Sequence, residues 1–183
     1  MDSIQIAALV AAAVISFWML GAYNRLIGLR NAIASAYAQL DEGLARRAEA
    51  ATALLAPLRQ ALPNEQGALD ALQAAQALLE HAALAMRARP ADATSAKQLA
   101  ATAADFNAAG SRVRALSEQQ AAMPADDAGA VAQQLLRWRE ADARIAFARQ
   151  LFNDAVLAYN EAVFQFPTRL LARVYGLAAA GLI

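Results

Sequence analysis

An uninterrupted apolar stretch near the N-terminus constrains this chain more than any other feature of its sequence. Residues 4–23 read IQIAALVAAAVISFWMLGAY and include no formal charge. About 20 helical residues rise about 30 Å, which matches the hydrocarbon core of a bilayer. Trp18 and Tyr23 lie toward the end of the stretch, where amphipathic rings favour the membrane interface. The stretch therefore predicts a transmembrane helix over residues 4–23, in contact with membrane lipid.

A cleaved signal peptide and a buried core helix are the alternatives for this stretch. A signal peptide begins with a positively charged region and has a shorter apolar core. Here no Lys or Arg precedes Arg25. An uncharged apolar run of this length favours a membrane span over both alternatives.

The positions of the first cations predict the orientation of the span. Arg25 and Arg30 follow it directly. Because cytoplasmic flanks are enriched in Lys and Arg, we expect residues 1–3 on the extracytoplasmic side of the membrane and residues 24–167 in the cytoplasm.

The remaining sequence predicts an all-α fold. Alanine, the strongest helix former, makes up roughly a quarter to a third of the chain, whereas there are only 8 glycines and 5 prolines. Apolar residues recur at spacings of three and four, and no run alternates as a strand would. We expect an N-terminal transmembrane helix that continues into an antiparallel four-helix-type bundle. The expected helices run to near Pro57 or Pro63, over Glu65–Arg87, over Ala96–Gln120 with a cap at Thr94 or Ser95, and from a cap at Asp126 or Asp127, after Met123-Pro124, to Pro167.

The last of these helices has the clearest core pattern. Ile145, Phe152, Tyr159 and Phe166 repeat every seven residues, and alanines stand between them. Such a heptad seam favours antiparallel packing in which large side chains fill the gaps beside alanines. We predict these four residues as the bundle seam.

Two pairs of asparagines are each spaced by one heptad. Asn24 and Asn31 lie on the first helix, and Asn153 and Asn160 lie on the last. Polar residues near a seam can set the register and the choice of partner. Simple surface exposure is the alternative.

The C-terminal tail, residues 168–183, is apolar after Arg169 and Arg173. It is too short and too charged at its start to predict a second span. A helix in the membrane interface and a hydrophobic contact between copies both remain open.

Composition argues against most kinds of chemistry. Lys+Arg and Asp+Glu both number 16, which disfavours nucleic acid as a partner. His81 is the only histidine and there is no cysteine, so no metal site, cofactor site or nucleophile–base pair is predicted. We expect the protein not to be an enzyme.

Two segments resemble the LemA family of bacterial membrane proteins. The motif Tyr-Asn followed by Phe-Pro-Thr near the end of the last helix is the more specific part. The residues in question are Tyr23–Asn31, Tyr37–Asp41 and Arg46-Arg47 in the first segment, and Ala146–Arg149, Phe152–Val156, Tyr159-Asn160 and Phe166–Thr168 in the second. The chain departs from the family pattern at Ala48–Leu58 and in its apolar tail, which replaces a charged one.

The resemblance implies a single-pass protein of the bacterial inner membrane, with a cytoplasmic antiparallel bundle and no enzyme activity. With the anchor and the apolar tail, it leads us to expect a membrane-anchored helical scaffold that forms homo-oligomers. The alternative is an adapter or regulator of a membrane peptidase or AAA-type ATPase in envelope stress, with contacts near Pro90 and Pro124.

Overall fold

The computed structural model describes residues 2–119 and 125–183, which fold as helices without a strand. This confirms the all-α prediction. The elements are α1 (Ser3–Ala61), the 3-10 helix η1 (Pro63–Glu65), α2 (Gln66–Ala88), α3 (Ala93–Gln119), α4 (Ala125–Phe164) and α5 (Thr168–Val174).

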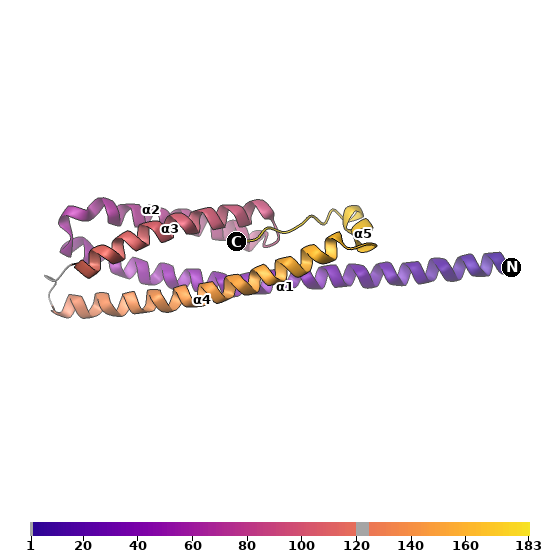
Figure 1. Cartoon of the computed structure of the whole chain (residues 1–183), viewed down its shortest axis with the longest axis horizontal. Coiled ribbons are helices and arrows are strands. Elements are labelled where there is room, and N and C mark those ends of the chain that lie inside the picture. Colours follow the sequence, from indigo (N-terminus) through magenta and orange to yellow (C-terminus); the bar gives the residue numbers. More distant parts are fainter. Residues whose placement is uncertain (1, 120–124) are drawn as a thin grey trace.

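Helix α1 runs unbroken from the apolar stretch into the bundle (Figure 1). Its 59 residues rise about 90 Å. Pro57 lies inside the helix, and the chain turns only after Ala61, where Pro63 begins η1. Among the described residues α1 is the one helix long and apolar enough to cross a membrane, and none of its apolar window is buried. Burial begins at Leu26.

The four long helices form two antiparallel pairs (Figure 1). Helix α4 runs back along α1, and their backbones lie close over much of α4; α3 pairs in the same way with α2. The backbone of α3 comes close mainly to that of α2, so α3 meets α1 and α4 through longer side chains. The α2–α3 pair thus lies on the α1–α4 pair, and residues 177–183 occupy a groove between α4 and the start of α3.

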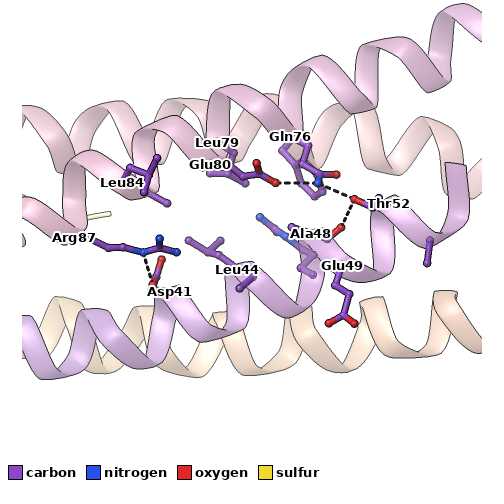
Figure 2. A pocket seen from close by; sticks show the side chains of 15 residues that line it. Asp41, Leu44, Ala48, Glu49, Thr52, Gln76, Leu79, Glu80, Leu84 and Arg87 are labelled. Carbon is purple, nitrogen blue, oxygen red and sulfur yellow. Dashed lines mark hydrogen bonds and ion pairs between the residues drawn. The ribbon is translucent and has the colours of Figure 1, made fainter.

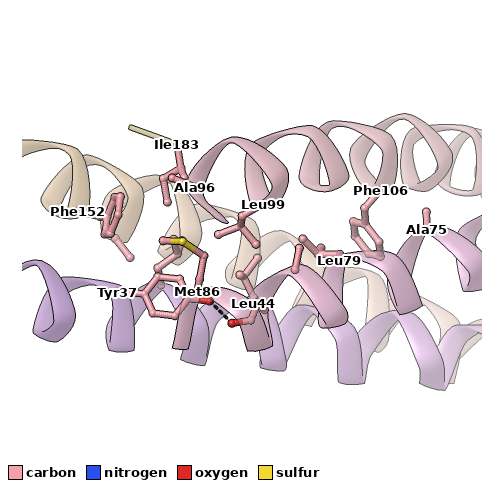
Figure 3. Packing of buried hydrophobic residues seen from close by; sticks show 14 of the residues in the cluster. Tyr37, Leu44, Ala75, Leu79, Met86, Ala96, Leu99, Phe106, Phe152 and Ile183 are labelled. Carbon is pink, nitrogen blue, oxygen red and sulfur yellow. Dashed lines mark hydrogen bonds between the residues drawn. The ribbon is translucent and has the colours of Figure 1, made fainter. Parts of the chain in front are cut away.

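Close packing of α1 on α4 depends on small residues facing large ones. A Cβ atom at Gly43 would lie 2.9 Å from Cγ1 of Ile145, so a larger residue at this crossing would force the Ile145 side chain to move. Phe152 and Tyr159 are fully buried in the same interface. Figure 3 shows Phe152 beside Tyr37 in the core shared by the long helices.

The predicted seam is wrong at Phe166. Its side chain is 73% exposed, and α4 ends at Phe164. The cause is Pro167, because a residue that precedes proline is disfavoured in the helical conformation. The heptad spacing of the sequence therefore extends to Phe166, although the helix has already ended at Phe164.

The start of α3 also differs from expectation. The helix begins at Ala93, so Thr94 and Ser95 lie in its first turn and do not cap it. Asp92 is the cap instead: its Oδ2 accepts hydrogen bonds from the Ser95 backbone N–H and from the Ser95 hydroxyl, both at 2.8 Å. The Met123-Pro124 break lies outside the described residues, and the side chains of Asp126 and Asp127 are likewise not described.

The tail is helical only over α5. After Gly176, whose φ of 64° is in the left-handed region, residues 177–183 are extended and run back along α4 (Figure 1). Ala180 and Ile183 are buried. Of the two alternatives left open for the tail, a helix is therefore present only over α5, and residues 177–183 lie within the fold of the chain itself.

Candidate functional site along α4

Two asparagines on α4 hold the extended tail. The side-chain amide of Asn160 donates to the carbonyl oxygen of Ala180 at 2.9 Å, and its Oδ1 accepts from the Ala180 N–H at 2.7 Å. Asn153 makes the same pair of bonds with Ile183, at 2.8 and 3.0 Å. Each asparagine thus binds both main-chain groups of one residue, as a neighbouring β-strand would.

Tyr159 and Arg149 on α4 make further hydrogen bonds to the tail. The Tyr159 hydroxyl donates to the carbonyl oxygen of Ala178 at 3.2 Å, and Nε of Arg149 donates to that of Ile183 at 2.7 Å. Burial raises the pKa of Tyr159, and nearby Arg30 lowers it by a smaller amount. The phenol is thus held in its neutral, hydrogen-donating form.

The other side of the groove is formed by the start of α3. A Cβ atom at Gly181 would lie 2.7 Å from Cα of Ala93 and 3.0 Å from Cβ of Ala96. Only glycine fits between the tail and α3 at this point. Figure 3 shows Ile183 beside Ala96 and Leu99, so the end of the tail joins the core.

The asparagines of the first helix are in a different environment. Asn24 and Asn31 are exposed on α1, and no hydrogen bond of either side chain occurs among the described residues. The structure thus brings Asn153 and Asn160 together at one site and leaves Asn24 and Asn31 at the surface. Arg25 and Arg30 are also exposed, at the point where the apolar stretch ends.

A buried guanidinium lies in the space between α1, α3 and α4. Arg47 is only 3% exposed. Its Nη1 donates to Asn107 at 2.9 Å and to Asp142 at 3.3 Å, and its Cζ lies 4.4 Å from the centre of the Phe106 ring. Burial lowers the pKa of Arg47, and the charge of Asp142 opposes this shift. Nε and Nη2 of Arg47 lack partners among the described residues.

An open cavity of about 660 Å³ separates α1 from α2 (Figure 2). Its walls are mostly apolar, with Leu44 and Leu84 among them. Part of its polar rim is paired: Arg87 contacts Asp41 at 2.7 Å, and the Gln76 amide donates to both Thr52 and Glu80. Oδ1 of Asp41, Oε1 of Gln76, and Nε and Nη2 of Arg47 also belong to the lining residues and are buried without partners among the described residues. No group of three or more metal-binding side chains occurs in the described part of the chain.

Sequence reasoning missed Arg47 and the tail. In the sequence Arg47 stands out only as part of a family motif. A polar residue on an otherwise apolar helix face does not indicate which residues it contacts. For the tail the available signal is the heptad pair Asn153 and Asn160, for which the sequence leaves open both a register-setting role and simple surface exposure.

The fold and this groove together define a class: an all-α protein in which a long N-terminal apolar helix continues into an antiparallel bundle. The chain belongs to the LemA family, whose family model matches residues 36–182. This match confirms the resemblance seen in the sequence. No curated protein matches the chain.

Proposed function

We propose that the protein is a non-enzymatic, membrane-anchored helical scaffold that self-assembles at the cytoplasmic face of the bacterial inner membrane. The main support is a row of large apolar side chains on the outer surface of α4. The row consists of Leu136, Phe147, Leu157 and Phe164, each more than half exposed.

The geometry of the row suits lateral packing of copies. At 1.5 Å per residue the row extends about 42 Å along α4, and at 3.6 residues per turn its members fall within about 100° of the helix circumference. Exposed Asp154 and Glu161 fall within the same arc and separate the apolar side chains, so copies would pack through alternating apolar and charged positions. A second copy offers an identical row, as a symmetric interface between like subunits requires.

The anchor and its orientation are part of the proposal. The apolar window of α1 is exposed along its whole length and therefore requires a covering other than this chain. Lipid fits its length and composition. Arg25 and Arg30, both exposed just after it, favour a cytoplasmic bundle by the positive-inside rule.

The end of the bundle next to the anchor supports the same placement. The Tyr175 ring, just after α5, lies 4.9 Å from the Tyr23 ring. Phe166, just before α5, and Leu170 and Val174, within it, are also exposed. In this proposal α5 lies in the membrane interface, where aromatic and apolar side chains are stabilised.

The mass of the full-length protein, extracted gently from its membrane, tests self-assembly. We expect a large assembly for the native chain and a smaller one for Leu157→Glu, because a charge in the row must be desolvated when copies pack. Leu78→Glu on α2 is the matched control, since Leu78 is similarly exposed. A monomeric native protein, or an equal effect of both substitutions, would contradict the proposal.

An adapter for a membrane peptidase or AAA-type ATPase is the second candidate. It is favoured by the cavity between α1 and α2, where exposed Leu84 lines the opening. The adapter predicts that one partner co-purifies in a fixed ratio and is lost in Leu84→Glu. Cross-linking in native membranes that captures only further copies of this chain would refute it.

A further inference from the structure

We propose that the groove between α3 and α4 is a receptor for an extended chain and that, in the assembly, it holds residues 177–183 of a neighbouring copy. This inference rests on the self-assembly proposed above and names the segment that copies exchange. In the single chain the same groove holds the tail of that chain.

The groove recognises main chain and is therefore ready for the tail of any copy. Asn153 and Asn160 are one heptad apart, which is about 10.5 Å along a helix. Ala180 and Ile183 are three residues apart, which is about 10 Å in an extended chain. Because the two repeats match, both residues of the tail are bound through their N–H and C=O groups.

The side chains of the tail fit this groove closely, so a tail of the same sequence is the complementary occupant. Gly181 passes so near Ala93 that a Cβ atom would clash, and Ile183 fills a buried position beside Ala96. A second copy supplies the same glycine and the same isoleucine at the same spacing.

The connection between α5 and the tail permits exchange. Val174 and Tyr175 are exposed, and no atom lies near the position that a Cβ of Gly176 would take. Gly176 already adopts a positive φ, and glycine is the residue that moves most freely between backbone conformations. Rotation at this exposed turn redirects the tail and breaks the hydrogen bond of 2.8 Å from the Leu177 N–H to the carbonyl oxygen of Ala172, whereas the contacts of residues 178–183 are recovered in the neighbouring copy.

The apolar row of α4 would place that neighbour beside the groove. Leu157 is four residues after Asn153, and Phe164 is four residues after Asn160, so each pair is adjacent on the helix surface. Copies that are anchored in the same membrane lie at the same distance from the membrane surface. The tail of one copy is therefore level with the groove of the next.

Cross-linking between two differently tagged full-length chains tests the exchange. The chain has no cysteine, so one tag is given Ile183→Cys and the other Ala100→Cys, because both positions border the same cavity of about 240 Å³ at the end of the tail. The two chains are co-expressed and treated in native membranes with a short bis-maleimide. Leu182→Cys, which is half-exposed, repeats the test without changing a buried residue.

We expect a product that contains both tags, in at least tenfold higher yield than from Ile183→Cys paired with Leu78→Cys. Asn153→Ala and Asn160→Ala in the chain that supplies the groove should abolish it. Cross-links that form only within a doubly substituted chain, in a preparation whose mass shows an assembly, would overturn tail exchange and leave self-assembly standing. A monomeric mass would overturn both.

Discussion

Replacing Asn160 by alanine should release the tail without unfolding the bundle. The substitution removes the two hydrogen bonds to Ala180, at 2.9 and 2.7 Å. A hydrogen bond contributes about 0.5–1.5 kcal/mol net, so the bound state of the tail should lose about 1–3 kcal/mol. Every 1.4 kcal/mol is a factor of ten in an equilibrium constant. Opening of the tail should therefore become about 5 to 150 times more frequent.

Amide hydrogen exchange of the full-length protein measures this opening directly. Exchange of the Ile183 N–H should accelerate by that factor, because Asn153 binds it only while the tail is docked. The Ala180 N–H loses its acceptor in the variant and therefore does not report opening. Exchange in the middle of α2 should not change, since alanine is a better helix former than asparagine and preserves α4. Asn31→Ala is the matched control, because Asn31 is exposed on α1. Unchanged exchange of the tail in Asn160→Ala, or equal acceleration in both variants, would refute the assigned role.

Three further predictions concern the core, a helix cap and the anchor. Phe152→Ala should lower the free energy of unfolding by about 3–5 kcal/mol in denaturant titrations, because this ring is fully buried, whereas Phe166→Ala should change it by less than about 0.5 kcal/mol. Asp92→Ala should destabilise the start of α3: hydrogen bonds from Ser95 lower the pKa of Asp92 below 3.8, so its contribution is present above that pH and is lost as the pH falls through the lowered pKa. The difference between native and variant melting temperatures should accordingly vanish in strong acid. Reversing Arg25 and Arg30 to Glu should reduce the fraction of a C-terminal reporter that is cytoplasmic; full retention would show that these charges do not set the orientation.

Features that depend on repeated local signals were predictable from the sequence. Abundant alanine and apolar spacings of three and four predicted helices whose ends lie within a few residues of those observed. The burial of Phe152 and Tyr159 agrees with the heptad pattern. Phe166 shows the limit of such counting, because the pattern does not register that Pro167 has already ended the helix.

The conformation of the tail follows from contacts that no local pattern encodes. Residues 177–183 read LAAAGLI, and three consecutive alanines favour a helix. An extended conformation is adopted because Asn153 and Asn160 bind its main chain, and these residues lie 30 and 20 positions before the residues that they bind. The polar partners of the buried Arg47 are similarly distant, 60 and 95 residues further along the chain.

The groove lies between α3 and α4 because α4 packs closely on α1, whereas α3 packs closely on α2. Helix α4 approaches α1 closely at Gly43, whereas α3 is kept from α4 by bulky groups, including Trp138, whose ring stacks on that of Phe106 at 5.4 Å. A space between two helix backbones must be filled, because protein interiors tolerate few voids. Aromatic rings and Arg47 fill one part of this space, and the tail fills the part nearer to α5. The tail is thus a component of the core that a single exposed turn connects to the bundle, so whichever copy supplies it becomes structurally joined to the copy that receives it.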